Sequence, residues 1–232
     1  MKEIELKEHK FTIREDTNDE YILNEAMNSP LYEKSLNNPK VIIDIGCHIG
    51  GFLVKNQLKY PDALLYGYEL IYNNYKLACK NATKASIYNL GVVGNYKPIN
   101  ICWDKINTGS YKYIYTENIK EVPNEPDYEI VDNDMEFIHI NDVLNLHNKI
   151  DMLKIDTEGS EYNIIQSISD ENYNKIQCMC VEFHNLVIRK YGIKMKYNNT
   201  REIRRLMNQK GFEEDYYKMY PRCEHIRFIK ND

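Results

Sequence analysis

Short runs of β-branched and other apolar residues recur along the sequence, and segments with helical periodicity separate them. The first run is VIIDI at residues 41–45, and further runs occupy residues 63–70, 85–93, 150–156 and 176–183. A strand is apolar at consecutive positions when helices cover both faces of its sheet, as in a parallel sheet. The alternation therefore predicts an α/β fold built on a mostly parallel sheet.

Other segments depart from this alternation. The C-terminal stretches FEEDYYKMY and HIRFIK predict two antiparallel strands. Residues 94–140 contain several prolines and little helical periodicity, so we expect hairpins and loops there, inserted over the substrate. Residues 1–39 predict an added strand and helix. The sequence thus predicts a single domain over residues 1–232, with 1–39 as an N-terminal extension.

Charge and hydropathy restrict the possible partners. A net charge of −5 and a pI near 5.8 argue against a general affinity for nucleic acid. No run approaches the roughly 20 apolar residues of a membrane span, and the N-terminus lacks the apolar segment of a secretory signal. We therefore expect a cytoplasmic protein. The basic stretch from Arg189 to Arg205 is either a partner surface or a solvated helix face, and the oligomeric state is not predicted.

The stretch VIIDIGCHIGG joins the first predicted strand to a helix through a glycine turn. Asp44 lies at the strand end, and Gly46 and Gly50 lie in the turn. Glycine lets a ligand approach the backbone, and a helix N-terminus offers N–H groups to an anion. Glu69 ends the next strand, where a carboxylate can accept hydrogen bonds from ribose hydroxyls. These residues predict a site for a nucleoside cofactor.

The turn lacks the middle glycine of the dinucleotide fingerprint G-x-G-x-x-G, which admits a pyrophosphate. This disfavours an NAD-dependent oxidoreductase, although that function stays an alternative on the same scaffold. A non-catalytic binding module that retains the fold is a second alternative.

Four motifs together resemble the FkbM family of S-adenosylmethionine-dependent methyltransferases. They are Asp44-Ile-Gly46-Cys-His48-Ile-Gly50, Tyr68-Glu69, Asn89-Leu-Gly91 and Lys154-Ile-Asp156-Thr-Glu158-Gly159-Ser-Glu161. The resemblance covers roughly residues 40–215, and position 48 departs from it because family members usually carry asparagine there. It implies a Rossmann-like class I methyltransferase fold with a seven-stranded sheet, and S-adenosylmethionine as cofactor. The implied cofactor-binding residues are Asp44, Gly46, His48, Gly50, Glu69, Asn89 and Gly91.

The resemblance also implies methyl transfer, typically to a hydroxyl oxygen of a sugar, glycan, lipid or other small molecule. Base-N methylation usually needs a Pro-Pro-aromatic loop, and attack on cytosine C5 needs a Pro-Cys nucleophile. Neither dipeptide occurs in the chain. The sequence does not identify the acceptor.

Ionisable residues cluster at the ends of the fourth and fifth predicted strands. Lys154 and Asp156 project to one side of their strand, and Glu182 and His184 do likewise. Parallel sheets bind ligands at the carboxyl ends of strands where the strand order reverses. If the first and fourth strands are neighbours there, these groups and Glu158 lie beside the methyl donor.

A sulfonium methyl is already electrophilic, so the protein must orient the acceptor and remove its proton. We predict Asp156 as the base or hydroxyl-orienting group, and Glu158 and His184 as alternative bases or substrate ligands. Lys154 either stabilises a developing alkoxide or forms a structural ion pair.

Residues outside these strands are candidate acceptor contacts. We expect Asn107 and Ser110 of the insertion to contact the acceptor, together with Glu182. Alternating tyrosines at 111, 113 and 115 either stack on a sugar or form a half-buried strand. We assign no metal ion. A divalent ion held by Asp156, Glu158, Glu182 and His184 is the open alternative.

Overall fold

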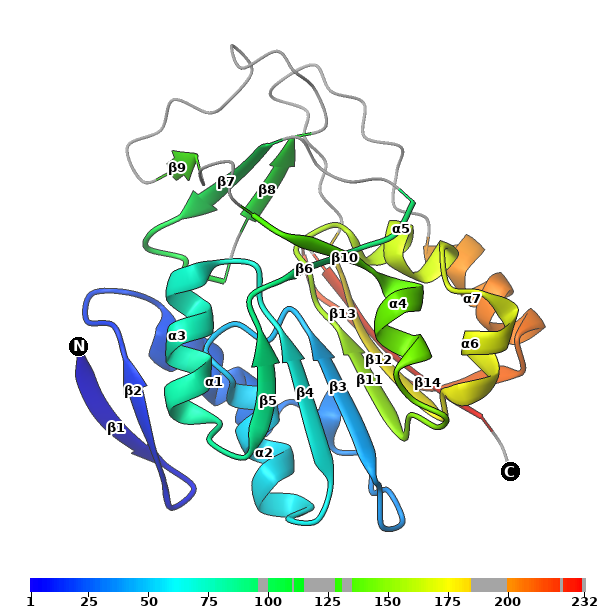
Figure 1. Cartoon of the computed structure of the whole chain (residues 1–232), viewed down its shortest axis with the longest axis horizontal. Helices are drawn as coiled ribbons and strands as arrows, with labels where there is room; N and C mark the ends of the chain where they lie inside the picture. The colour runs from blue at the N-terminus through cyan, green and yellow to red at the C-terminus, as the bar shows by residue number, and fades with distance from the viewer. Residues whose placement is uncertain are drawn as a thin grey trace.

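The computed structural model describes residues 1–95, 100–109, 111–114, 128–130, 135–184, 200–221 and 223–230. Its centre is a seven-stranded sheet in the order β13-β14-β12-β11-β3-β4-β5 (Figure 1). These strands are β3 (Val41–Ile45), β4 (Leu64–Tyr68), β5 (Ala85–Tyr88), β11 (Met152–Ile155), β12 (Cys178–His184), β13 (Phe212–Met219) and β14 (Cys223–Lys230). Strands β12 through β5 are parallel, whereas β14 is antiparallel to both of its neighbours. The predicted sheet and its C-terminal antiparallel hairpin are confirmed.

Helices cover both faces of the sheet, and successive strand residues point to opposite faces. Ile42 packs in the cluster that includes side chains of α1 (Asp19–Asn28), α2 (Gly51–Lys59) and α3 (Tyr72–Asn81). Ile43 packs in the opposite cluster, which includes side chains of α4 (Ile140–Asn145), α5 (Glu161–Gln166), α6 (Asp170–Lys175) and α7 (Thr200–Gln209). Because both faces are buried, the strands are apolar at consecutive positions. No helix in the described ranges has the length and apolar character needed to cross a bilayer.

The strand order of the central sheet changes direction between β3 and β11. Strands β4 and β5 lie on one side of β3, whereas β11 and β12 lie on the other. Asp44 of β3 is in register with Lys154 of β11 and with Gly67 of β4. The first and fourth predicted strands are therefore neighbours, as the sequence predicted, and their carboxyl ends lie at the switch point where such sheets bind ligands.

Two smaller sheets lie beyond the carboxyl ends of the central strands (Figure 1). Strand β6 (Gly91–Val93) pairs in parallel with β10 (Phe137–His139). Strand β7 (Asn100–Asp104) pairs antiparallel with both β8 (Tyr111–Ile114) and β9 (Tyr128–Ile130). Antiparallel strands thus occur in residues 94–140 as expected. The role of this segment as a substrate cover stays a prediction.

The single strand predicted over residues 85–93 is in fact two strands. Asn89 separates β5 from β6, because its Nδ2 donates to the backbone oxygens of Glu69 at 2.8 Å and Leu70 at 2.9 Å. The chain then leaves the central sheet, and Gly91 packs tightly against the ring of Phe137 on β10.

The N-terminal segment contains one strand more than predicted. Strands β1 (Lys2–Leu6) and β2 (His9–Ile13) form a hairpin ahead of α1, and the 3-10 helix η1 (Pro30–Tyr32) follows α1. The turn residues Lys7 and Glu8 have φ values of 49° and 64°. Hairpin turns of this geometry usually carry Asn or Gly, so no turn residue marks this one in the sequence.

Candidate active site

The turn after β3 has left-handed backbone at several positions. The φ angle is 79° at Gly46, 48° at His48 and 90° at Gly50. Gly46 also touches the end of β11, since a Cβ built there would lie 1.8 Å from the backbone oxygen of Asp156. Histidine, like asparagine, adopts the left-handed region more readily than most residues, which explains how position 48 departs from the family pattern. The turn holds the backbones of Gly46 and Asp156 in contact.

Glu69 follows β4 and is buried against this turn. Its Oε2 accepts a hydrogen bond from the N–H of His48 at 2.9 Å, and its Oε1 accepts one from the N–H of Ile71 at 2.8 Å. Each carboxylate oxygen can accept more than one hydrogen bond, so hydroxyl donors can still bind. Asn89, which donates to the carbonyls of Glu69 and Leu70, supports the same loop.

A pocket of ≈ 360 Å³, including its open mouth, lies between Glu69 and the β6–β10 pair. Its walls are mostly apolar, and Glu69 is the charged residue among them. The other lining residues are Ile45, Gly46, Leu70, Leu90, Gly91, Val92, Val93, Phe137 and Thr157. An apolar slot with a carboxylate beside it suits a nucleoside, whose base packs on the walls while its ribose donates hydrogen bonds. The predicted cofactor residues Gly46, Glu69 and Gly91 lie together here.

A second pocket, of ≈ 430 Å³, shares Gly46 with the first and extends under α1. Its charged residues are the acids Glu25, Asp44, Asp156 and Glu182, with Lys154 and His48 beside them. Tyr32 and Phe52 are among its apolar walls. The excess of carboxylates suits a cationic group.

Lys154 joins β3, the glycine turn and β11. Its Nζ lies 3.0 Å from Asp44 Oδ1 and 3.3 Å from Asp156 Oδ2, and donates to the backbone oxygen of Gly46 at 3.1 Å. Burial opposes its charge, but the carboxylates of Asp156 and Asp44 outweigh burial and hold the pKa of Lys154 above its ordinary value. Burial raises the pKa of Asp44 to about 6, against the opposing effect of Lys154. Lys154 is therefore a fixed cation, not a base.

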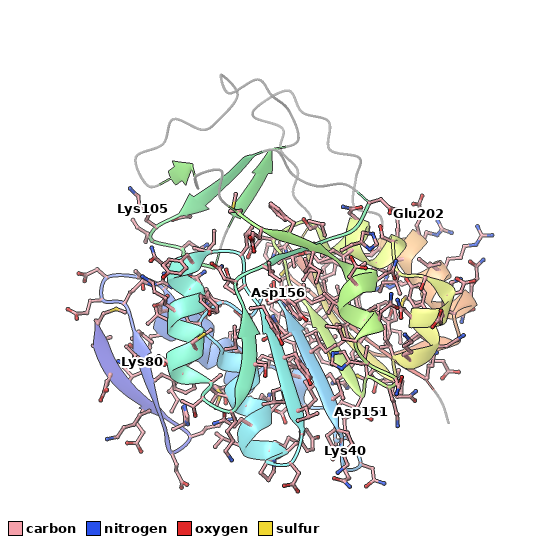
Figure 2. The ribbon with its side chains drawn as sticks, viewed as in Figure 1. Lys40, Lys80, Lys105, Asp151, Asp156 and Glu202 are labelled. Carbon is pink, nitrogen blue, oxygen red and sulfur yellow. The ribbon has the colours of Figure 1, made fainter. Side chains whose placement is uncertain are left out.

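The loop between β11 and α5 carries Asp156 and Glu158, and Glu161 holds it in shape. Oε1 of the fully buried Glu161 accepts hydrogen bonds from the N–H groups of Thr157 and Gly159, both at 2.9 Å. Glu158 has a φ of 53°. Figure 2 shows Asp156 at the carboxyl ends of the central strands.

His184, at the end of β12, faces this loop. Its Nδ1 lies 3.1 Å from Glu161 Oε1, and its Nε2 lies 3.4 Å from Glu158 Oε1 and 3.5 Å from Glu182 Oε1. Burial by itself lowers the pKa of His184, but the carboxylates of Glu158 and Glu161 outweigh it and raise this pKa well above its ordinary value. Burial raises the pKa of Glu158 to about 8, although His184 opposes the shift. Burial also raises the pKa of Asp156.

Glu182 lies between His184 and His225. Its Oε2 is 2.9 Å from Nε2 of His225, the residue opposite it in the β12–β14 register. Burial disfavours the charge on Glu182, but His225 and His184 outweigh burial and lower the pKa of Glu182 to about 2. Sequence reasoning missed His225, because the pairing of β12 with a strand some forty residues later leaves no local signal.

A second group that sequence reasoning missed fixes the ring of His48. Its Nε2 lies 3.0 Å from Thr108 Oγ1, and Thr108 Oγ1 donates to Asp19 Oδ1 at 2.6 Å. Arg14 donates to both oxygens of Asp19. Burial lowers the pKa of His48 to about 3, so this ring is neutral at neutral pH. Residues of the N-terminal extension and of the insertion thus meet at the glycine turn after β3.

The predicted acceptor contacts do not all join the site. Glu182 lines the pocket under α1. Asn107 is exposed and accepts a hydrogen bond from Asn18, and it is not among the residues that line either pocket. Ser110, the tyrosine side chains at 111, 113 and 115, and most of the basic stretch lie outside the described residues. Arg204, within the described part of that stretch, pairs with Glu214 at 2.8 Å.

A glycine turn, a buried acid at the end of the next strand and an apolar slot at a sheet switch point are features of a Rossmann-like domain that takes a nucleoside cofactor. The family described as Methyltransferase FkbM domain matches residues 44–214. The chain therefore belongs to the FkbM methyltransferase family, and its cofactor is S-adenosylmethionine. This confirms the predicted family and cofactor and sets the NAD alternative aside.

A solved methyltransferase structure shares the fold, and a second shows a weaker likeness to this chain. Trm1 from Pyrococcus horikoshii, in complex with S-adenosyl-L-methionine, aligns with a TM-score of 0.54 at 12% identity over 100% of this chain and 62% of that chain. The precorrin-6y C5,15-methyltransferase from Geobacter metallireducens GS-15 gives a TM-score of 0.48 at 10% identity, over 95% of this chain and 93% of that chain. Comparison with the curated proteins finds no match.

Proposed function

We propose that this protein transfers a methyl group from S-adenosylmethionine to a hydroxyl oxygen of a sugar, glycan, lipid or other small molecule. The observation that carries the proposal is the contact between the glycine turn after β3 and Asp156, which directly follows β11. The backbone of Asp156 is packed on Gly46, and its side chain lines the pocket that shares Gly46 with the nucleoside slot. A base at that position can reach an acceptor beside the transferred methyl group.

The chain's residues fit both ends of the cofactor. The slot beside Glu69 suits the adenosine, and the acid-rich pocket under α1 suits the positive charges of the methionine end. When bound, S-adenosylmethionine supplies an electrophilic methyl group on a sulfonium. The residues of this chain must then position the acceptor and take its proton.

Asp156 is the proposed base. Burial raises its pKa, which makes its carboxylate a stronger proton acceptor, and Lys154 at 3.3 Å keeps it oriented. Asp156 would take the hydroxyl proton, so that the acceptor oxygen could attack the electrophilic methyl group that bound S-adenosylmethionine would supply. His184 is less suited to be a base, because a pKa well above the ordinary value keeps it protonated.

The test is formation of S-adenosylhomocysteine with a panel of hydroxylated acceptors and with matched amines that lack a hydroxyl group. The expected result is turnover with at least one hydroxylated acceptor and a methyl ether in the product by mass spectrometry and NMR. Methylation confined to nitrogen or carbon would overturn O-methyl transfer.

A further inference from the structure

Segments that are far apart in the sequence meet at the side chain of His48. Asp19 belongs to α1 of the N-terminal extension and Thr108 to the insertion, and both are fully buried. Nε2 of His48 lies 3.0 Å from Thr108 Oγ1, which lies 2.6 Å from Asp19 Oδ1. Arg14 donates to both oxygens of Asp19, at 2.9 and 2.8 Å. Arg14, Asp19 and Thr108 together form what we call the His48 clamp.

The hydrogen bonds of the clamp decide which ring nitrogen of His48 carries a proton. The carboxylate of Asp19, paired with Arg14, only accepts hydrogen bonds, so the one hydroxyl proton of Thr108 is donated to it. Thr108 Oγ1 can then only accept from His48, which requires a proton on Nε2. Arg14 Nη2 lies 3.5 Å from Nε2, too far to compete with the contact at 3.0 Å. Because burial lowers the pKa of His48 to about 3, the ring is neutral and Nδ1 carries no proton.

Thr108 is held in this position through its own backbone. Its N–H donates to Asn18 Oδ1 at 2.9 Å, and its carbonyl oxygen accepts from Asn74 Nδ2 at 3.0 Å. Asn18 precedes α1, and Asn74 lies on α3, the helix that follows Glu69. These bonds place the hydroxyl group of Thr108 between Asp19 and His48.

The clamp holds a residue whose backbone is in an unfavourable conformation. The φ of His48 is 48°, and a non-glycine residue keeps such an angle only where its surroundings require it. The N–H of His48 donates to Glu69 Oε2 at 2.9 Å. His48 is thus held at its ring by the clamp and at its N–H by Glu69. Loss of the clamp leaves one of these two restraints.

We propose that Thr108 and Asp19 are positioning residues for the cofactor. Through the ring of His48, they keep the glycine turn after β3 in the shape in which Glu69 can accept hydrogen bonds from the ribose. Neither Thr108 nor Asp19 lines a described pocket, whereas His48 does, so their effect on the cofactor passes through His48. This inference rests on the proposed place of the ribose at Glu69 and is independent of the kind of acceptor.

Stability alone does not account for the buried acid of the clamp. A buried ion pair contributes little compared with apolar residues of the same volume. Asp19 instead joins the N-terminal extension to the insertion, because it accepts from Arg14 and from Thr108. The cofactor turn is therefore held from outside by two segments that flank the central sheet.

The experiment measures S-adenosylhomocysteine binding to full-length protein by calorimetry. Thr108→Val keeps the shape of the side chain but removes the acceptor of His48 Nε2–H, and the dissociation constant should rise about tenfold. Thr108→Ser keeps the hydroxyl group and should stay within about threefold of wild type. Thr200→Val is the matched control, because Thr200 also donates to a buried carboxylate, Glu224 Oε1 at 3.1 Å, and neither residue lines a described pocket. It should leave the dissociation constant unchanged.

Nitrogen-15 NMR of histidine-labelled wild type tests the order of the hydrogen bonds without changing the clamp. The proton of the neutral His48 ring is expected on Nε2, with the signals of His48 assigned by their loss in His48→Asn. A proton on Nδ1 would overturn the proposed order. A purely structural role of Thr108 would not determine which nitrogen is protonated.

Three results in the binding assay would overturn the role of the clamp. They are an unchanged affinity in Thr108→Val, an equal loss in Thr108→Ser, and an equal loss in Thr200→Val. Glu69→Gln separates this failure from an error in the place of the cofactor. If Glu69→Gln weakens binding but Thr108→Val does not, only the clamp is overturned; if Glu69→Gln binds as tightly as wild type, the ribose lies elsewhere and the clamp's role fails with it. The assay contains no acceptor, so neither result bears on methyl transfer to a hydroxyl.

Discussion

The candidate site has two halves, one beside β3 and β4 and one beside β11 and β12, which meet at Gly46. They hold their charged groups in different ways. On the β3–β4 side, each oxygen of Glu69 accepts one backbone N–H, and both donors lie close to it in the same pair of turns. On the β11–β12 side, Glu158 and Glu182 pair with histidines of other strands, and Asp156 pairs with Lys154 of β11. The carboxylate of the first half is thus held by backbone donors of the turns beside it. The second is a set of mutually dependent charges, which is where pKa values shift and proton transfer is possible.

The largest expected effect comes from Gly46, where the two halves touch. In Gly46→Ala, the alanine must adopt a left-handed φ of 79°, and its Cβ would lie 1.8 Å from the backbone oxygen of Asp156. We expect the free energy of unfolding in urea to fall by more than about 3 kcal/mol. Gly211→Ala is the matched control. The φ of Gly211 is 82°, but a Cβ built there meets nothing within 4 Å among the described residues, so this change should lower the free energy of unfolding by only about 1–2 kcal/mol. Equal losses would show that the halves do not meet at Gly46.

The next effect isolates chemistry in the acid half. Asp156→Asn should lower kcat by roughly a hundredfold while S-adenosylhomocysteine affinity stays within a few fold, because it removes the base and no residue of the nucleoside slot beside Glu69. Asp151 lies at the opposite end of β11 (Figure 2), where its Oδ2 accepts the N–H groups of Lys40 and Val41. Asp151→Asn should leave kcat unchanged. An unchanged kcat in Asp156→Asn would remove Asp156 from catalysis.

In the half beside Glu69 we expect a smaller effect, on cofactor affinity and not on kcat. Glu69→Gln keeps the shape of the side chain but cannot accept both backbone N–H groups and a ribose hydroxyl equally well. The dissociation constant of S-adenosylhomocysteine, measured by calorimetry, should rise about tenfold, with kcat at saturating cofactor nearly unchanged. A loss of kcat at saturation would mean that the two halves are not functionally separate.

The smallest effect concerns pH and the neutral ring of His48. Its folded pKa of about 3 lies below the ordinary histidine value of 6.5, so below pH 6.5 the unfolded chain binds a proton that the folded protein does not. His48 thus makes the protein less stable as the pH falls from 6.5 toward 3. His48→Asn cannot titrate and tolerates the left-handed backbone. Between pH 7 and pH 5.5, the variant should lose about 1 kcal/mol less unfolding free energy than wild type. Parallel losses would mean that His48 does not titrate in this way.

Local pattern was enough to predict the cofactor half and the strand-end acids. The glycine turn and Glu69 lie within consecutive elements, and Lys154, Asp156 and Glu158 follow one strand. A parallel sheet brings such ends together whatever the loops do. The sequence therefore predicted the fold, the family and most of the charged residues that line the pockets.

Long-range pairing explains what the sequence could not predict. His225 reaches Glu182 only because β14 runs antiparallel to β12, and Thr108 reaches His48 only because the insertion folds back on the N-terminal extension. Asn107 accordingly lies against Asn18 and not among the pocket residues. Asn89 also broke a strand that β-propensity alone would have continued.

A crystal structure with S-adenosylhomocysteine tests most directly whether the two halves face each other across the methyl-transfer site. The predicted result places the ribose on Glu69 and the sulfur opposite the carboxylates of Asp156 and Glu158, with room between them for one methyl group and one acceptor oxygen. A sulfur that points away from Asp156, with the carboxylates on the far side of the glycine turn, would contradict it.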